Sequence, residues 1–97
     1  YKVFEAFAAQ VLCTLKAWDD EEFCRKRVGL GGKLGSIDRS KMNVMGGSVA
    51  VGHPFGATGA RITATLGKLL EQKGKGRGLI SVCTGGGMGV TAILERP

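Results

Sequence analysis

The sequence predicts an α/β fold, because stretches with helical periodicity alternate with β-rich runs along its 97 residues. Two amphipathic stripes and a pair of β-rich runs near the C-terminal end carry this prediction. The length suits one domain, 1–97, and a hydrophobic content of 43% is ordinary for a globular core. The 17 glycines are clustered rather than periodic, so they indicate loops and exclude a collagen-like chain.

The first half is predicted to hold a strand end, two helices and a loop. Residues 1–4 resemble the end of a strand, and the following helical stripe consists of Phe4, Phe7, Ala8, Val11, Leu12 and Leu15. Asp19 and Asp20 are candidate caps of a second helix, with Glu22 at capping-box spacing from Asp19 and Gly29 as its stop. Residues 28–42 contain four glycines without a period, which predicts a surface loop.

The second half is predicted to hold one strand, one long helix and two further strands. Residues 43–51 alternate weakly and favour a short strand, and Pro54 disfavours a helix at His53. A helix should begin at 57–59 and end at Gly74, with an apolar face of Ile62, Leu66, Leu69 and Leu70. Residues 75–77 are expected to be a basic linker, and residues 79–82 and 90–94 to be strands around a glycine cluster.

Charge and cysteine content limit the possible partners. Fourteen Lys and Arg against eight Asp and Glu give a net charge of +6, which favours an anionic partner or a solvated basic face. Nucleic acid is disfavoured because no groove-reading helix or stacking motif accompanies that charge. Three cysteines without a C-x-x-C pair indicate no metal site and no disulfide framework, and they favour a reducing compartment. No run reaches the roughly 18 apolar residues of a membrane span, and no signal peptide or peroxisomal Ser-Lys-Leu terminus is visible.

Two glycine-rich stretches hold the groups best suited to chemistry. His53 is the only histidine and lies in a glycine-rich turn, and Cys83 precedes Gly85, Gly86 and Gly87. An imidazole can exchange protons near neutral pH, and backbone N–H groups beside a strand-end thiol can stabilise an oxyanion. A structural histidine and a buried cysteine remain the alternative at this point.

Three segments resemble the thiolase family. The stretch Asn43-Val-Met-Gly-Gly-Ser-Val-Ala-Val-Gly-His-Pro-Phe-Gly-Ala-Thr-Gly-Ala-Arg is similar to the signature around its catalytic histidine, and Cys83-Thr-Gly-Gly-Gly-Met-Gly to that around its second cysteine. Glu5-Ala-Phe-Ala-Ala-Gln resembles the Asn-Glu-Ala-Phe-Ala segment that precedes both. The order and spacing cover nearly the whole chain, and the histidine motif resembles most the 3-ketoacyl-CoA thiolases of fatty-acid β-oxidation, including the trifunctional-complex type.

The resemblance implies an acetyl-CoA acyltransferase, with coenzyme A as a substrate and neither metal nor other cofactor. His53 would activate a nucleophilic cysteine and hold an enolate oxygen, while Cys83 would be the acid and base. The backbone of Gly85 would contribute to an oxyanion hole. The remaining substrate-binding positions would be Phe7, which lines the pantetheine channel, and Gly52, Pro54 and Phe55.

The resemblance also implies what surrounds this chain. The thiolase fold repeats a β-α-β-α-β-α-β-β half with strand order 3-2-1-4-5, and this chain would be a partial half that lacks its first strand and helix. The missing central strand would leave unpaired backbone groups, so we expect part of a longer subunit, or a chain that folds only with a partner. The expected partners are acyl-CoA, an N-terminal thiolase half and further copies in a homo-oligomer. The expected location is the bacterial cytoplasm, or a mitochondrial or other organelle matrix.

Two departures from the family pattern open alternatives. The nucleophilic cysteine belongs to the family's N-terminal half, and Cys13 and Cys24 are expected to be packing or surface residues on helices. Phe4 stands where the family has Asn or His to position a water, and it has no donor or acceptor. The isolated chain is therefore expected to be inactive. The alternatives are a catalytically inactive acyl-CoA-binding or subunit-interaction module and a condensing enzyme of the same superfamily, although the latter generally has histidine or asparagine in place of Cys83.

Overall fold

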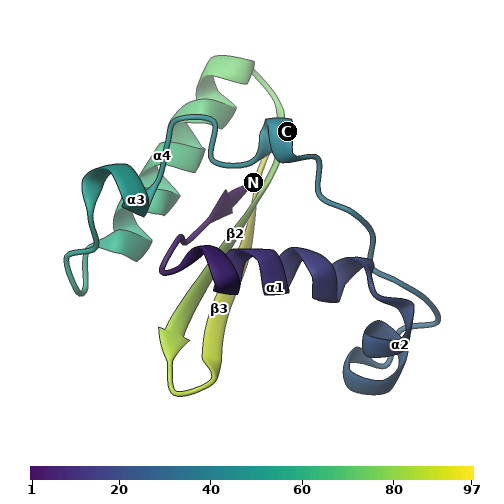
Figure 1. Cartoon of the computed structure of the whole chain (residues 1–97). Coiled ribbons are helices and arrows are strands. Elements are labelled where there is room, and N and C mark those ends of the chain that lie inside the picture. Colours follow the sequence, from purple (N-terminus) through teal and green to yellow (C-terminus); the bar gives the residue numbers. More distant parts are fainter.

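The computed structural model describes all 97 residues as an α/β chain with a three-stranded mixed sheet (Figure 1). The order of elements is β1 (Lys2–Val3), α1 (Ala8–Asp19), α2 (Glu21–Phe23), α3 (Ser48–Val51), α4 (Thr58–Lys73), β2 (Gly76–Gly85) and β3 (Met88–Arg96). A π-helical turn, Cys24–Val28, continues α2, and a 3-10 turn spans Arg39–Lys41. The α/β prediction is confirmed.

The sheet has the order β1-β2-β3, with β1 parallel and β3 antiparallel to β2. Lys2 pairs with Ile80 and Val3 with Ser81, so β1 lies directly beside β2 with no strand between them. We expected a missing central strand to leave backbone groups unpaired. Along Lys2 and Val3 this is not so, because β1 pairs directly with β2. No strand lies on the other edge of β1.

The prediction of a strand at 43–51 is wrong, because this segment contains the four-residue helix α3. Asn43 forms the hydrogen bonds with β1 that a neighbouring strand would otherwise form. It adopts a left-handed backbone with φ of 50°, and its side chain makes both ladder bonds itself: Oδ1 accepts from the Val3 N–H at 2.9 Å, and Nδ2 donates to the Val3 carbonyl at 2.9 Å. The Asn43 side chain thus provides hydrogen-bond partners for both backbone groups of Val3 on the free edge of β1.

The first helix begins at Ala8 rather than Phe4, so the predicted stripe is divided between two structures. Phe4 belongs to the core beside β1, whereas Phe7 is the N-cap and is 75% exposed. Asp20, not Asp19, caps α2 by accepting from the Phe23 N–H at 2.8 Å, which also removes the expected capping box with Glu22. The stop at Gly29 is confirmed by its φ of 76°.

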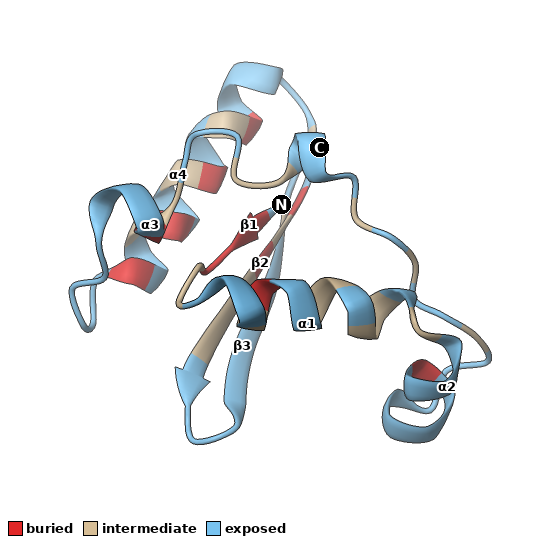
Figure 2. Cartoon of the chain, viewed as in Figure 1, coloured by how far each residue is buried: buried red, intermediate tan, exposed pale blue.

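The core lies between α4 and the sheet. Its buried members are Phe4, Ile62, Leu66, Leu70 and Ile80, with Leu94 packed against them. The predicted helix and its apolar face are confirmed, except that Leu69 is only half-buried. In Figure 2 the buried residues follow β1 and one side of α4, whereas β3 is exposed along nearly its whole length.

The two C-terminal strands are longer than predicted and form a hairpin. Arg77 lies in β2 and not in a linker, because its backbone pairs with Glu95 of β3, and its guanidinium also lies 3.1 Å from the Glu95 carboxylate. The turn is Gly86-Gly87, with φ of 63° and 76°, a left-handed conformation that favours glycine. No helix of this chain combines the length and apolar character that crossing a membrane requires. No cluster of three or more His, Cys, Asp or Glu is placed to hold a metal ion.

Candidate active site

A cavity of about 1130 Å³ opens where the β1–α1 connection, the segment around α3 and the β2–β3 hairpin meet. Five predicted site residues line it: Phe7, His53, Phe55, Cys83 and Gly85. Segments more than 20 residues apart in the sequence therefore contribute to one space. Gly52 and Pro54 do not line it, although they flank His53 in the chain.

The ring of His53 is held by contacts on three sides. Its Nδ1 lies 2.6 Å from Oγ1 of Thr58, the buried first residue of α4. The Phe4 ring lies 4.4 Å from the imidazole centroid, and the Phe55 ring 5.1 Å away at an interplanar angle of 58°. These contacts orient the ring, which stays exposed, and Nε2 is the ring nitrogen that has no hydrogen-bond partner within the chain.

Phe4 occupies the position that departs from the family pattern, and the structure shows what it does there. Its side chain is buried and belongs both to the hydrophobic core and to the stack on His53. An aromatic ring supplies no hydrogen bond to a water or an oxyanion. Phe4 therefore orients the imidazole by packing.

Cys83 approaches the cavity from β2. It is half-buried, pairs with Gly89 of β3, and lies just before an irregularity in the ladder between Cys83 and Gly85. Gly85 has φ of 74°, which brings the chain into the glycine turn. The thiol and the backbone of Gly85 thus belong to one strand end at the cavity wall. The roles assigned to them by resemblance stay predictions.

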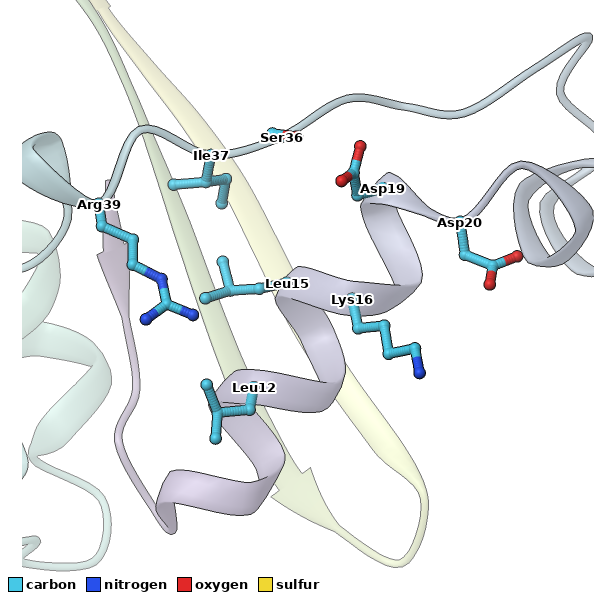
Figure 3. A pocket seen from close by; sticks show the side chains of 8 residues that line it. All are labelled: Leu12, Leu15, Lys16, Asp19, Asp20, Ser36, Ile37 and Arg39. Atoms are coloured by element: carbon cyan, nitrogen blue, oxygen red, sulfur yellow. The ribbon is translucent and has the colours of Figure 1, made fainter.

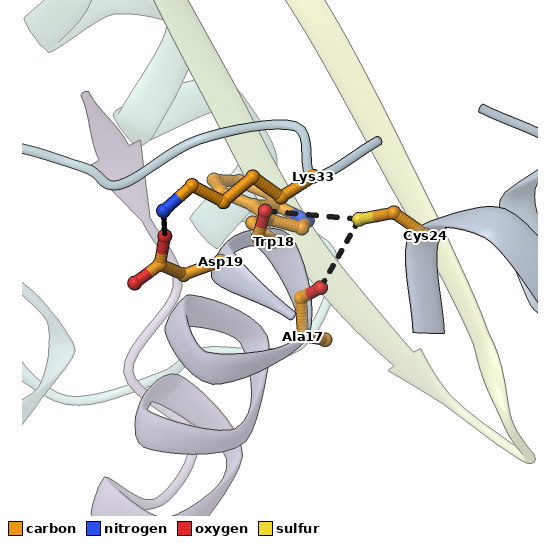
Figure 4. A network of polar contacts seen from close by, with 5 residues as sticks. All are labelled: Ala17, Trp18, Asp19, Cys24 and Lys33. Atoms are coloured by element: carbon orange, nitrogen blue, oxygen red, sulfur yellow. Dashed lines mark hydrogen bonds and ion pairs between the residues drawn. The ribbon is translucent and has the colours of Figure 1, made fainter. Parts of the chain in front are cut away.

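The other two cysteines lie outside this cavity. Cys13 is exposed on α1. Cys24 is buried, and its thiol donates to the carbonyls of Ala17 and Trp18 at 3.4 and 3.7 Å, at the C-terminal end of α1 (Figure 4). Both carbonyls lie in the last turn of α1 and also accept from the backbone N–H groups of Asp20 and Gly35.

Next to Cys24, an exposed ion pair closes the loop that follows α2. Lys33 Nζ donates to Asp19 Oδ1 at 2.8 Å (Figure 4). This hydrogen bond lowers the pKa of Asp19, helped by a further bond from Ser36, and it raises the pKa of Lys33. The contacts of Cys24 and Lys33 thus connect the segment that follows α2 to the C-terminal end of α1.

A second hollow of about 460 Å³ lies between α1 and the chain at 36–39 (Figure 3). Its lining mixes Leu12, Leu15 and Ile37 with charged side chains. None of the predicted site residues lies there, and the potentially reactive groups lie in the larger cavity.

Sequence reasoning assigned no role to three residues that shape the site: Glu5, Thr58 and Arg61. Thr58 follows His53 by five residues and begins the next helix, a spacing that could have indicated a partner for the imidazole. Glu5 is distant from His53 in the sequence, and Arg61 contacts the carbonyl of Gly52 rather than the imidazole. No local sequence pattern therefore indicates either residue.

An oriented imidazole and a thiol that line one cavity beside a mixed sheet are groups on which thiol-dependent acyl transfer can be built. The family model described as thiolase, C-terminal domain, matches residues 1–96, and the chain belongs to the thiolase family.

Known proteins similar to this chain carry consistent names. The 3-ketoacyl-CoA thiolases of Pectobacterium atrosepticum and Yersinia pestis are 52% and 51% identical to it over 92 residues, which are 94% of this chain and 21% of each relative. The crystal structure of the Bacillus anthracis acetyl-CoA acetyltransferase matches it with a TM-score of 0.72 and 40% identity, over 97% of this chain and 20% of that chain. The chain thus spans about a fifth of the length of these relatives.

Proposed function

We propose that this chain contributes His53 and Cys83 to the thiolytic cleavage of a 3-ketoacyl-CoA by coenzyme A, or to the reverse Claisen condensation. The observation that carries the proposal is that both side chains line the same cavity. The two are 30 residues apart in sequence and come from different elements, so the fold itself brings them together. The names of the relatives, 3-ketoacyl-CoA thiolase and acetyl-CoA acetyltransferase, support the same reaction class.

The cavity wall suits a thioester with a long arm. Apolar side chains, among them Phe7, Val49, Phe55 and Val90, surround the polar groups, so a flexible arm can lie against them while few polar atoms orient the reacting carbon. No charged cluster surrounds the two reactive groups. Binding of the phosphate-bearing end of coenzyme A is therefore assigned to other surfaces.

The proposed cleavage balances with one additional thiol. A cysteine thiolate attacks the 3-keto carbon, the C2–C3 bond breaks, and its electron pair passes to C2 of the departing acetyl-CoA enolate. Cys83 gives its proton to C2, leaving an acyl-cysteine. The Cys83 thiolate then takes the proton of coenzyme A, whose sulfur attacks the acyl group and releases the shortened acyl-CoA.

Thr58 fits both tasks assigned to His53. With its hydroxyl donating to Nδ1, the imidazole keeps a proton on Nε2 and can donate to an enolate oxygen. With its hydroxyl accepting from Nδ1, Nε2 is free to take a proton from a thiol. The hydroxyl can take either orientation without moving the ring, provided that the imidazole exchanges its proton between Nε2 and Nδ1.

The attacking thiolate is proposed to come from outside these 97 residues, in an N-terminal thiolase half. Within the chain, Cys13 and Cys24 do not line the cavity, and Cys24 is already hydrogen-bonded to the end of α1. Homo-oligomeric assembly of the complete enzyme is part of the same proposal.

One observation favours a second candidate function. Phe4 packs on His53 without offering a hydrogen bond, which removes a polar group from beside the imidazole. A module that binds acyl-CoA or another subunit without turnover would keep this cavity and tolerate that loss.

The experiment measures thiolysis of a 3-ketoacyl-CoA by this chain alone and by its mixture with an N-terminal thiolase half. We expect turnover only in the mixture, with a loss of about 100-fold or more in His53→Ala and Cys83→Ala. Cys13→Ser is the matched control and should keep full activity, because Cys13 is exposed and lies outside the cavity.

The other outcomes separate the alternatives. Coenzyme A binding without turnover in the mixture would favour the inactive module. Turnover by the chain alone, abolished in Cys13→Ser or Cys24→Ser, would instead make one of its own cysteines the nucleophile and overturn the proposed division of roles.

A further inference from the structure

The helix that delivers His53 has almost no apolar anchor. α3 has four residues, far fewer than an isolated helix needs to be stable in water. Val49 is 84% exposed and Val51 is 64% exposed, and only Ser48 is buried. Since hydrophobic packing does not hold this helix, polar contacts must determine the position of its backbone and of the peptide that leads to His53, two residues beyond its end.

Glu5 holds the N-terminal end of α3. Its Oε2 accepts from the backbone N–H of Val49 at 3.2 Å, and its Oε1 accepts from Asn43 Nδ2 at 2.7 Å. The N-cap residue, Gly47, has no side chain to cap the helix, so the carboxylate supplies the missing acceptor from another element. A Cβ on Gly47 would collide with that carboxylate, so glycine is what admits Glu5.

Arg61 of α4 contacts both ends of α3. Its guanidinium donates to the carbonyl of Gly52 at 3.0 Å and to Oγ of Ser48 at 2.7 Å. Gly52 immediately precedes His53, and Ser48 is the first residue of α3. The fork of one guanidinium thus joins the beginning of the helix to the peptide that carries the imidazole.

We propose that Glu5 and Arg61 are positioning residues, which fix His53 by holding α3 at its two ends. They act through the backbone of α3 and do not touch the imidazole. The consequence for catalysis rests on the proposed function, whereas the positioning itself is a property of this chain and can be measured without turnover.

The decisive measurement is amide hydrogen exchange of Val49, together with the NMR signals of the His53 ring, in the full 97-residue chain. In Glu5→Ala the Val49 amide loses its acceptor, and we expect its exchange to accelerate about tenfold or more. In Arg61→Ala we expect the His53 ring signals to broaden or double. Glu71→Ala and Arg77→Ala remove exposed paired charges away from α3 and should change neither signal.

A glycine pair provides a test that leaves the carboxylate in place. Gly47→Ala should displace Glu5 and accelerate Val49 exchange as Glu5→Ala does. Gly31→Ala is the matched control, since a methyl group there meets open space. Unchanged Val49 exchange in both Glu5→Ala and Gly47→Ala, with the fold intact by circular dichroism, would overturn the role of Glu5. Unaltered His53 signals in Arg61→Ala would overturn that of Arg61.

Turnover in the mixture with an N-terminal thiolase half tests whether this positioning affects catalysis. Glu5→Ala and Arg61→Ala should lower kcat at least about tenfold while KM stays within about twofold, because the apolar side chains of the cavity wall are unchanged. Glu5→Gln retains one acceptor oxygen and should recover part of the kcat, which a purely charge-based role would not allow. A wild-type mixture without turnover would refute the proposed function, while the exchange data would still decide the positioning of His53.

Discussion

The α4–β2 packing and the segment 43–57 are held together by different physical means. Leu66 and Ile80 belong to the buried apolar core, where removal of each side chain from water stabilises the fold without fixing a particular contact geometry. The segment 43–57 leaves its large apolar residues exposed and is fixed by hydrogen bonds that Lys2 and Arg61 donate and Glu5 accepts. Substitutions in the first region should therefore change stability, and those in the second should change geometry more than stability.

The largest expected effect comes from emptying the core. Leu66→Ala removes a side chain that is 4% exposed and packed with Phe4, Ile62, Leu70 and Ile80, so we expect a loss of about 2–5 kcal/mol in the free energy of unfolding. Urea denaturation measures it. Leu34→Ala, at a residue that is 62% exposed, should change the free energy by less than about 0.5 kcal/mol. Equal effects of the two substitutions would contradict the division into regions.

The scaffold was the part that sequence patterns could predict. The period of Ile62, Leu66 and Leu70 and the stop at Gly74 locate α4, and glycines at Gly86-Gly87 locate the hairpin turn. These signals are local, because each depends on neighbours within one turn. The register of β1 beside β2 was not predictable, since nothing local encodes the pairing of Lys2 with Ile80.

The candidate site was predictable in its reactive groups and not in its supports. His53 and Cys83 were marked by their glycine-rich contexts and by the family resemblance, and the structure places both at one cavity. Asn43 was assigned to a strand because residues 43–51 alternate weakly, and this alternation cannot reveal that its side chain pairs with the edge of β1 instead. Glu5 acts across 44 residues on a backbone N–H, so its contact appears only in three dimensions.

The next prediction makes the same chemical change at two glycines. Gly78 lies beneath Leu66, and a Cβ there would collide with that side chain, so Gly78→Ala should cost about 1–3 kcal/mol of stability. Gly67 lies on an exposed part of α4 with open space around it, so Gly67→Ala should stabilise the chain by about 0.5–1 kcal/mol. Thermal or urea unfolding of both variants measures the difference, and a destabilised Gly67→Ala would show that the outer side of α4 is constrained.

The smallest expected effect concerns a polar anchor that is costly to bury. Lys2 is 4% exposed, and its ammonium donates to the Gly46 carbonyl at 2.8 Å, which ties the beginning of segment 43–57 to β1. Burial lowers its pKa from the usual 10.5, while the carboxylate of Glu5 raises it and Arg61 lowers it further. Because the unfolded chain binds more protons between the lowered pKa and 10.5, stability should rise with pH through that window and fall as pH drops through it.

Glu5→Gln sharpens this expectation by removing the charge that supports the ammonium. The pKa of Lys2 should fall further, and the window over which stability rises with pH should widen. NMR titration of the Lys2 side chain measures the pKa, and urea unfolding between pH 8 and the usual lysine range of about 10.4 measures the slope. Lys2→Met is the control, because it keeps the buried stem and abolishes the contribution of this group to the slope. A Lys2 that titrates at or above the usual lysine value in the wild type would show that the hydrogen bond to Gly46 outweighs desolvation, and that this anchor favours its charged form.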